Sequence, residues 1–475
     1  MPDQDAPAVV WLRDDLRVSD NPALREAVDS DRPVVVVHVL DDSGDVGRPL
    51  GGASRWWLHH SLEALDASLR KRGNRLVLRH GDGAAEIASV LRRTGAALLT
   101  MNRRYVHGER EQDDRVRRAA EADGVTVSMH TASLLHEPGD LLNGDGERFA
   151  VFTPFFAALT RAGAPRQPIP APSTIAAWSG TVHSEDLAAL RLLPTAPDWS
   201  AGLGETWTPG EKGAHRRVDE FVHERLAHYA DRRDRPAAEV SSRLSPHLKF
   251  GEVSPYQLWH RVQQADAPAD VRQKFLTELG WREFDYDLLD AHPDLETVNV
   301  HRGFDAFPWA DVDDDVLRAW QEGRTGVPLV DAGMRQLWRT GWMHNRVRMV
   351  TASFLIKNLR YDWRIGERWF WDTLVDADPA NNAAQWQWVA GSGADAAPFF
   401  RVFNPLLQAQ KFDPDGEYVA TWVPELRDLD AAGRLAPWTV PDGPTSGDDP
   451  AYPTPIVDLK ASRAAALDAY QRMRA

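Results

Sequence analysis

Cysteine is absent from this chain of 475 residues. Its absence excludes disulfide bonds, thiolate nucleophiles, zinc sites built on thiolates and iron–sulfur clusters held by Cys. Any redox chemistry must therefore be carried by a cofactor or by aromatic side chains, and we expect no metal site.

Long apolar runs are also absent, and none approaches the length that spans a bilayer. The start of the chain, from Met1 to Asp5, lacks the basic segment and the long apolar segment of a signal peptide. We therefore expect a cytoplasmic protein without a membrane partner. The length favours two domains joined by connecting segments.

Positive charge is in short supply, because 55 Lys and Arg face 70 Asp and Glu and leave a net charge of −15. This balance argues at first against a nucleic-acid partner, since phosphate binding depends on Lys and Arg. The distribution modifies that view. Residues 330–412 hold ten Lys and Arg against seven Asp and Glu, which is consistent with a locally basic surface on an acidic protein.

Short apolar runs alternate with helical periods in the first part of the chain. Runs of strand length lie at residues 9–12, 33–40, 75–78 and 96–99, and helix-like stretches lie between them at 21–28, 54–72 and 83–93. This alternation predicts a doubly wound parallel sheet in an α/β domain over residues 7–132.

The rest of the chain changes character twice. Pro, Gly, Ser and Thr are frequent from about 163 to 213, so residues 133–213 are interpreted as a long interdomain linker. Helical periods then dominate to about residue 435, and fourteen of the nineteen Trp lie beyond residue 200. We predict an all-α domain over 214–435 and a C-terminal tail over 436–475.

Two stretches place mixed side chains on one helix face. Glu278, Trp281 and Arg282 are spaced i, i+3 and i+4, so a carboxylate, a flat ring and a guanidinium can line one side of a cavity. An exposed Glu–Arg pair beside a core Trp explains the same spacing. Asn345 and Met349 share a face with Arg348, and such a mixed lining favours a bound polar ligand.

Two further stretches combine polar groups with a helix start. Residues 376–388 gather carboxylates and amides before two Trp, a pattern that also fits a polar loop capping a helix. Residues 241–246 place hydroxyls and a guanidinium before Pro246. This segment can hold a phosphate, or Ser245 can simply cap the helix.

Taken together, these stretches resemble the flavin domain of photolyases and cryptochromes, as do Trp11–Arg17 and Phe403–Pro405 near the two ends. The similarity spans roughly residues 8–430 and includes residues 319–323 and 328–332 in the family's order. It implies an N-terminal antenna domain and a C-terminal helical domain that binds FAD and DNA. The pattern is most similar to the bacterial cyclobutane pyrimidine dimer photolyases.

The resemblance implies roles for individual residues around FAD. Arg348 would pair with Asp376, and Asn382 would face the flavin N5. Phe275 occupies a place where relatives often have Trp. The residues that this resemblance assigns to FAD binding are Tyr229, Ser241, Ser242, Arg243, Leu244, Ser245, Phe275, Arg282, Asn345, Arg348, Asp376, Asp378 and Asn382.

The substrate that the resemblance implies is a cyclobutane dimer flipped out of the duplex over the flavin, as photolyases flip their target base. Excited reduced FAD would donate an electron that splits the dimer. The residues expected to take part are Glu278, Trp281, Asn345, Met349, Asn382 and Trp388, and those expected to hold DNA are Arg233, Glu278, Trp281, Asn345, Arg346, Arg401 and Gln408.

Three Trp match the family's electron-transfer chain from the flavin to the surface, namely Trp386, Trp363 and Trp309. Core packing explains any one of them equally well, because nine Trp lie between residues 309 and 388.

Two alternatives remain within the family. A cryptochrome would be a light sensor, but plant-type sensors usually carry Asp where this chain has Asn382, and no long regulatory tail follows residue 475. A (6-4) photolyase would carry a His-rich pocket helix, whereas this chain has Asn345 and Met349. His344 points about 100° away around an ideal helix.

The antenna pigment stays undecided between 5,10-methenyltetrahydrofolate and 8-hydroxy-5-deazaflavin. Glu109 matches a position that contacts folate in some relatives, although a Glu at a helix start is common for other reasons. We further expect damaged DNA as the partner and a monomeric protein.

Overall fold

The computed structural model describes residues 5–44, 46–395, 400–447 and 450–474. Residues 1–4, where no signal peptide is expected, lie outside the described residues. Contacts divide the chain into two units: unit 1 comprises residues 1–224 and 242–293, and unit 2 comprises residues 225–241 and 294–475. Each unit is described by itself below.

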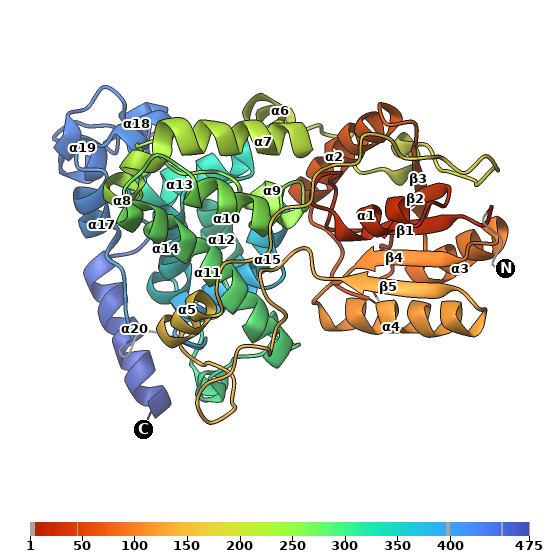
Figure 1. The fold of residues 1–475 in the computed structure, drawn as a ribbon. Helices are drawn as coiled ribbons and strands as arrows, with labels where there is room; N and C mark the ends of the chain where they lie inside the picture. Colours follow the sequence, from red (N-terminus) through yellow and green to blue (C-terminus); the bar gives the residue numbers. More distant parts are fainter. Residues whose placement is uncertain (1–4, 45, 396–399, 448–449, 475) are drawn as a thin grey trace. The chain divides into compact units, whose positions relative to one another are not determined.

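Unit 1 contains a five-stranded parallel sheet with the order β3-β2-β1-β4-β5. All seven residues of β2 are buried, as expected for a parallel strand covered on both faces. Helices α1 and α2 lie on one face of the sheet, and α3 and α4 pack against each other on the opposite face (Figure 1). The strands are β1 (Ala8–Leu12), β2 (Val34–Leu40), β3 (Leu76–His80), β4 (Leu98–Asn102) and β5 (Thr126–His130).

The predicted doubly wound sheet is therefore confirmed, with one strand more than the sequence suggested. Strand β5 escaped notice because it forms the sheet edge and is only half-buried, so its apolar pattern is weak. The helices of unit 1 are α1 (Pro22–Asp29), α2 (Gly52–Arg70), α3 (Gly83–Thr94), α4 (His107–Ala122), α5 (Phe152–Arg161), α6 (Ala201–Thr206), α7 (Glu211–Glu220), α9 (Ser245–Lys249), α10 (Pro255–Gln263) and α11 (Ala269–Ala291).

The segment interpreted as a surface linker, residues 133–213, is part of the packed unit 1. It contains α5, the short turn η1 (Leu187–Leu190) and α6. The backbone N–H of Glu185 donates to the carbonyl of Leu78 on β3, and Ile175 and Val182 are buried. The chain at Ser184 and Glu185 thus covers part of the free edge of β3, a protection that natural sheets need.

Unit 2 is helical, as predicted, but its boundary with unit 1 differs from residue 214. Helices α7, α9, α10 and α11 belong to unit 1 by their contacts. The helices of unit 2 are α8 (Tyr229–Arg232), α12 (Asp314–Gln321), α13 (Pro328–Thr340), α14 (Asn345–Ser353), α15 (Trp363–Thr373), α16 (Asn381–Ala390), α17 (Pro405–Phe412), α18 (Glu417–Trp422), α19 (Ala431–Leu435) and α20 (Leu459–Arg474).

Short helical turns complete both units. Two have π-helical geometry: η2 (Phe221–Arg225), at the boundary of the units, and η5 (Phe354–Asn358), directly after α14. The remaining turns are η3 (Leu226–His228), η4 (Arg302–Ala306), η6 (Pro424–Leu426) and η7 (Pro437–Thr439).

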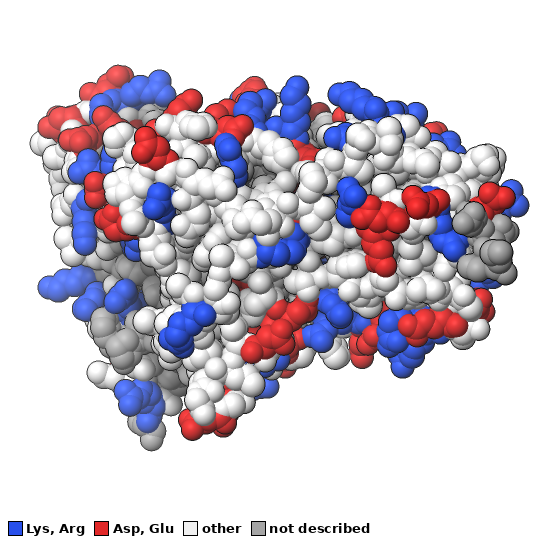
Figure 2. All heavy atoms as spheres, viewed as in Figure 1, with Lys and Arg blue, Asp and Glu red and all other residues white. Residues whose placement is uncertain are grey.

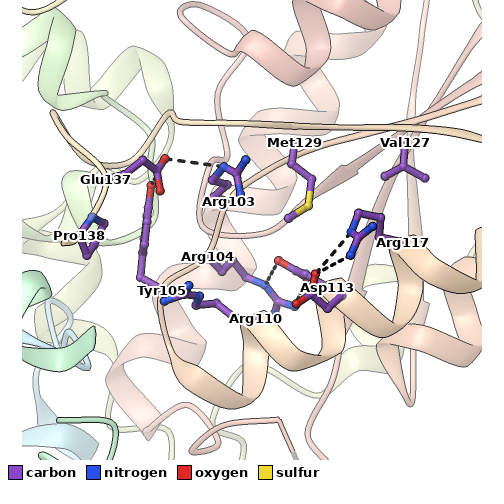
Figure 3. A pocket seen from close by; sticks show the side chains of 11 residues that line it. Arg103, Arg104, Tyr105, Arg110, Asp113, Arg117, Val127, Met129, Glu137 and Pro138 are labelled. Atoms are coloured by element: carbon purple, nitrogen blue, oxygen red, sulfur yellow. Dashed lines mark hydrogen bonds and ion pairs between the residues drawn. The ribbon is translucent and has the colours of Figure 1, made fainter. Parts of the chain in front are cut away.

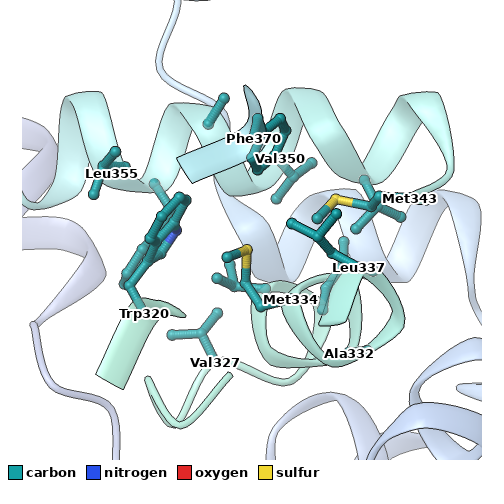
Figure 4. Packing of buried hydrophobic residues seen from close by; sticks show 14 of the residues in the cluster. Trp320, Val327, Ala332, Met334, Leu337, Met343, Val350, Leu355 and Phe370 are labelled. Atoms are coloured by element: carbon teal, nitrogen blue, oxygen red, sulfur yellow. The ribbon is translucent and has the colours of Figure 1, made fainter. Parts of the chain in front are cut away.

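The core of unit 2 is formed by side chains from several helices. Figure 4 shows Trp320, Met334, Leu337, Val350 and Phe370 converging between α12, α13, α14 and α15. The predicted tail, residues 436–475, is not separate from this core, because Tyr452 and two Ala of α20 are fully buried. Apolar faces on α20 explain this docking, since an isolated amphipathic helix gains stability by packing.

Local signals explain many helix boundaries. The Asn21 side chain accepts from the backbone N–H of Leu24 and caps α1, and Ser254 forms a capping box with Gln257 at the start of α10. Helix α13 ends at Gly341, whose φ of 65° lies in the left-handed region that favours glycine.

The two signs of charge are interspersed on the face drawn in Figure 2, where Lys and Arg alternate with Asp and Glu. This mixture agrees with an acidic chain that still carries local positive charge.

Candidate functional site

Helix α14 begins at Asn345 because His344 occupies the N-cap. The Nδ1 atom of His344 accepts from the backbone N–H of Arg346 at 3.2 Å. Its ring is buried, and burial lowers the pKa of His344 to about 4, which keeps the ring neutral. His344 thus serves the helix start, whereas Asn345 is exposed in the first turn.

Arg348 of α14 forms the expected ion pair with Asp376. Its Nη2 lies 2.8 Å from Oδ2 and 3.1 Å from Oδ1 of the carboxylate, whose side chain is only 3% exposed. The Nε of Arg348 donates to the backbone oxygen of Met343 at 2.8 Å. These bonds hold the carboxylate of Asp376 in a nearly dry position ahead of α16.

Asp378 organises the start of α16. Its Oδ1 accepts from the backbone N–H groups of Ala380 and Asn381 at 3.0 and 2.9 Å, and from the side-chain amide of Asn381 at 2.7 Å. These bonds fix the backbone just before α16, whose N-cap position is Ala380 and has no side-chain cap bond. They also fix where the first turn of α16 places Asn382.

The amide of Asn382 is oriented by Glu367 on α15. Its Nδ2 donates to the backbone oxygen of Glu367 at 3.1 Å and to the carboxylate Oε1 at 2.7 Å. Both amide hydrogens are used, so the carbonyl Oδ1 is the group that Asn382 can still offer, and in the described chain it has no donor. Sequence reasoning missed Glu367, because no local spacing connects residues fifteen positions apart.

The three Trp of the expected electron-transfer chain lie in unit 2 at different depths. Trp386 and Trp363 are buried and Trp309 is half-buried. The Nε1 of Trp363 donates to Oδ1 of Asn299 at 2.9 Å. Helices α15 and α16 approach closely at Gly366, where a Cβ would lie 2.1 Å from the Trp386 ring.

Trp388 lies two residues after Trp386 on α16 and is half-buried. Its Nε1 donates to the backbone oxygen of Asp395 at 3.1 Å. Arg401 is exposed, with its guanidinium 5.9 Å from the centroid of the Phe403 ring. Gln408 is half-buried on α17. These three side chains retain surface through which they can meet a macromolecule.

Arg346 is engaged within unit 2, because its Nη2 lies 2.9 Å from Oδ1 of Asp234. Its Nη1 also donates to the Sδ of Met349 at 3.8 Å. Arg233 lies 5.2 Å above the ring of the buried Tyr229. A phosphate at Arg346 would therefore have to compete with a carboxylate.

In unit 1, Trp281 of α11 stacks on Phe152 of α5, with centroids 3.7 Å apart and planes within 7°. The helices come close because Gly280 lies under Phe156, where a Cβ would be 2.3 Å from the ring. Trp281 stays partly exposed, as does Glu278 one turn earlier. The role of Phe152 was missed, since a Phe before a helix reads only as core.

Two other residues of α11 are tied to unit 1. The Nη1 of Arg282 donates to the backbone oxygen of Ser133 at 2.7 Å, and its guanidinium lies 5.0 Å from the Tyr286 ring centroid. Phe275 is buried against Phe221, with centroids 4.5 Å apart. Arg282 thus anchors the chain segment that follows β5.

The candidate phosphate segment crosses the boundary of the units, with Ser241 in unit 2 and residues 242–245 in unit 1. Helix α9 begins at Ser245, and Leu244 occupies the N-cap without a side-chain cap bond. Ser245 therefore does not cap the helix. The Oγ of Ser242 accepts from the N–H of Leu244 at 3.4 Å, and Arg243 has a φ of 52°.

Three buried side chains with unsatisfied polar atoms lie near the carboxyl ends of β1 and β2. The sheet order reverses between β1 and β4, where doubly wound sheets bind ligands. Buried atoms there lack partners among the described residues: Nε1 of Trp11, Nη1 of Arg13 and Nε2 of His38. Burial also lowers the pKa of His38 to about 4. Unsatisfied buried groups of this kind invite a polar ligand.

A cavity of about 440 Å³ lies beside α4 and the outer edge of β5 (Figure 3). Arg104 lies 2.5 Å from Asp113, and Arg117 lies 3.3 Å from Asp114, so its cations are largely neutralised. Glu109 lies next to this wall, 3.8 Å from Arg104, and burial raises its pKa. The lining residues are Arg103, Arg104, Tyr105, Arg110, Asp113, Asp114, Arg117, Val127, Met129, Glu137 and Pro138.

Within the described ranges, no group of three or more His, Asp or Glu is arranged to hold a metal ion. The helices of the same ranges include none long and apolar enough to cross a membrane.

Two family models match the chain. The model described as DNA photolyase matches residues 8–173, and the model described as FAD binding domain of DNA photolyase matches residues 275–472. A deoxyribodipyrimidine photo-lyase of Agrobacterium fabrum (strain C58) is 47% identical, covering 99% of this chain and 98% of the relative. Cryptochrome-1 of Arabidopsis thaliana is 36% identical, covering 98% of this chain and 70% of the relative.

The fold is shared with a bacterial class III photolyase from Agrobacterium tumefaciens, known from a crystal structure. The TM-score is 0.95 at 47% identity, and the match covers 99% of this chain and 98% of that chain. The parallel sheet, the helical unit with Arg348 paired to the buried Asp376, and the two matching family models lead to one assignment. The chain belongs to the photolyase/cryptochrome family and carries the FAD-binding domain of that family.

Proposed function

We propose that this protein is a deoxyribodipyrimidine photolyase that splits cyclobutane pyrimidine dimers in DNA under light. The observation that carries the proposal is the amide of Asn382, whose Nδ2 is held by Glu367 so that Oδ1 is left as an acceptor. A reduced flavin has an N–H donor at N5, and an acceptor there stabilises the form that can donate an electron.

The residues present fit a bound FAD. Asp376, Asp378 and Asn382 are at most 9% exposed, yet they concentrate acceptors that an apolar core avoids. The guanidinium of Arg348 neutralises Asp376, so the pair can meet a polar ring edge or ribose without an uncompensated charge. When bound and excited by light, reduced FAD supplies the electron that opens the cyclobutane ring.

The chain's own residues bind and orient the lesion in this proposal. Trp281 is a preformed platform, because its contact with Phe152 restricts the indole before any base arrives. Trp388 of unit 2 offers a second flat surface, and Asn345 and Met349 of the same unit are proposed to contact the lesion. Glu278 accepts hydrogen bonds from base N–H donors.

The arrangement of His344 supports dimer repair over repair of (6-4) products. A (6-4) enzyme needs an imidazole that can transfer a proton at the pocket. The Nδ1 of His344 is engaged by Arg346, and the lowered pKa disfavours the protonated ring. Light sensing of the cryptochrome kind stays the second candidate, because a cryptochrome is among the relatives at 36% identity.

The region near the carboxyl ends of β1 and β2 in unit 1 is the proposed place of the antenna pigment. Trp11, Arg13 and His38 there offer one flat ring and several unsatisfied polar atoms. Glu109 is proposed as a contact of the pigment, and both a folate and a deazaflavin suit such a lining. Trp386, Trp363 and Trp309 are proposed to carry electrons to oxidised FAD.

The test is repair of two defined lesions by the FAD-loaded protein. Illuminated protein is expected to restore thymine from an oligonucleotide with one cyclobutane dimer and to leave a (6-4) product intact. Repair of the (6-4) oligonucleotide, or no light-dependent repair of the dimer, would contradict the proposal.

The first variant for this test is Glu278→Ala. It is expected to weaken dimer binding about tenfold or more while FAD stays bound, because a charged acceptor contributes about 1.5–3 kcal/mol to a hydrogen bond. Glu63→Ala is the matched control, since Glu63 is an exposed carboxylate of the same unit, with 69% of its side chain accessible. Undiminished repair by Glu278→Ala would remove Glu278 from the lesion pocket.

A further inference from the structure

Lys357 is a fully buried lysine in η5, the π-helical turn that follows α14. Its Nζ donates to the backbone oxygen of Ala390 at 2.5 Å and lies 3.1 Å from the centroid of the Phe400 ring. No carboxylate of the described residues pairs with it, and burial lowers the pKa of Lys357 well below its ordinary value. A dry charge without a counterion is costly, and the lowered pKa expresses that cost, so the ammonium form depends on the groups that contact it.

The first stabilising group is the carboxyl end of α16. Gly391 closes this helix in the left-handed region, and its N–H bonds to the oxygen of Gln387. The oxygen of Ala390 is one of the terminal carbonyls that have no helical partner, and a cation there also complements the helix dipole.

The second stabilising group is the Phe400 ring. Its face attracts a cation, and the attraction is strongest when both groups are desolvated. Phe400 is 8% exposed and stacks on Tyr470 of α20, with centroids 4.5 Å apart and planes within 7°. The ammonium therefore joins the end of α16 to a ring that α20 holds in place.

The two groups that contact Lys357, the Ala390 oxygen and the Phe400 ring, lie close in the chain to side chains that are proposed to bind DNA. Trp388 lies on the last turn of α16, and Arg401 directly follows Phe400. A small cavity of about 30 Å³ has Lys357, Trp388 and Arg401 in its wall. The other lining residues are Phe304, Val389, Gly391, Phe400, Phe403 and Tyr470.

We propose that Lys357 is a positioning residue for lesion binding: its ammonium holds the end of α16 and Phe400 together, and thereby sets Trp388 and Arg401 against damaged DNA. This inference rests on the proposed function and adds a residue that touches neither flavin nor DNA. Because the ammonium is fully buried, it neutralises no DNA phosphate.

The test is Lys357→Met, which keeps an unbranched side chain of similar length and removes the charge. The dissociation constant for a dimer-containing oligonucleotide is measured per FAD-loaded molecule at several salt concentrations. We expect about tenfold weaker binding, with unchanged FAD content and an unchanged slope of log Kd against log salt. Lys460→Met is the control, because it removes an exposed charge from α20.

Three results would overturn the proposal. Binding by Lys357→Met equal to the parent would show that positioning is unnecessary. A salt slope lower by about 0.9 would show that Lys357 meets a phosphate directly. If Lys357→Met fails to fold or to bind FAD, Phe400→Leu decides instead: it keeps the ammonium and its helix contact, and parent-like lesion binding by this variant would overturn the proposal.

Failure of the proposed function is distinguishable from failure of this inference. The parent protein is assayed first for light-driven dimer repair. A parent that repairs no dimer contradicts the function, whereas a repairing parent with parent-like variants contradicts only the role of Lys357.

Discussion

The contact between Asn382 and Glu367 shows how a single amide acquires a direction. An amide presents two donors and one acceptor, and which end faces a ligand depends on what holds the other end. Glu367 is buried and takes both Nδ2 hydrogens. The acceptor end of Asn382 is therefore selected by a residue that need not touch the flavin.

Glu367→Leu is predicted to loosen this selection. The backbone oxygen of Glu367 still accepts one hydrogen, but the carboxylate acceptor at 2.7 Å is lost. FAD should remain bound, and the reduced flavin, prepared under light with an external donor, should reoxidise in air about threefold faster or more, as loss of one hydrogen bond implies. Absorbance after illumination measures this rate.

Glu367→Gln serves as the control, because its side-chain oxygen can still accept from Asn382. Its rate of flavin reoxidation should lie between the rates of the parent and of Glu367→Leu. Equal reoxidation rates in all three proteins would show that Glu367 does not direct the amide.

At the scale of elements, the approach of α15 to α16 decides where the candidate electron carriers lie. Gly366 removes the side chain that would collide with Trp386, so the two helices pack at that point. Trp363, at the start of α15, is fully buried, whereas Trp309 lies outside these helices and is half-buried. The three Trp therefore differ in exposure: Trp363 and Trp386 are buried, and Trp309 is partly exposed.

Trp363→Phe is predicted to slow photoreduction of oxidised FAD severalfold while leaving FAD bound. Phenylalanine retains most of the packing volume but is much harder to oxidise than indole. It also removes the hydrogen bond to Asn299, so a stability loss of about 1 kcal/mol is expected. The rate of photoreduction is measured from flavin absorbance after timed illumination with an external electron donor.

Trp199→Phe is the matched control for photoreduction, since Trp199 is 36% exposed in unit 1. Photoreduction of Trp363→Phe as fast as in the parent and in this control would remove Trp363 from the electron-transfer chain.

At the scale of the whole molecule, the C-terminal segment is bound to unit 2 by a buried polar contact. Asp331 on α13 accepts from the backbone N–H groups of Thr325 and Gly326, at 2.8 and 3.0 Å, and from the hydroxyl of Tyr452. Burial raises the pKa of Asp331 to about 6, although the hydrogen bonds from Thr325 and Tyr452 oppose that shift.

This pKa predicts how stability changes with pH. Between about pH 4 and 6 the folded protein holds the Asp331 proton more tightly than the unfolded chain, so this carboxyl contributes stability at low pH and loses it as pH rises. Its contribution should fall by on the order of 3 kcal/mol across that window. The side chain of Asp331→Asn cannot titrate. The stability of this variant relative to the parent, measured by thermal unfolding, should therefore increase between pH 4 and 7.

Asp315→Asn controls for the change of charge, because the Asp315 side chain is 89% exposed. Its stability relative to the parent should vary little over the same pH range. A constant gap between the parent and Asp331→Asn would mean that the Asp331 carboxyl titrates normally in the folded protein.

Local sequence patterns were enough to predict most of the elements and part of the site. Apolar runs of strand length placed the ends of four of the five strands to within three residues, because strands buried on both faces leave a continuous apolar record. The motif residues around Arg348, Asp376 and Asn382 indicated the flavin family. Local periodicity sufficed there because neighbours in the chain share a helix or a loop.

The distant residues that support these motifs become neighbours only when the chain folds. Glu367 directs Asn382, Phe152 supports Trp281, and Lys357 joins α16 to Phe400, yet each pair is separated by many residues. Periodicity tells which face of an element is buried, but not what covers that face. The same reason explains why residues 133–213 looked like a linker: their partner, the edge of β3, is distant in sequence and adjacent only after folding.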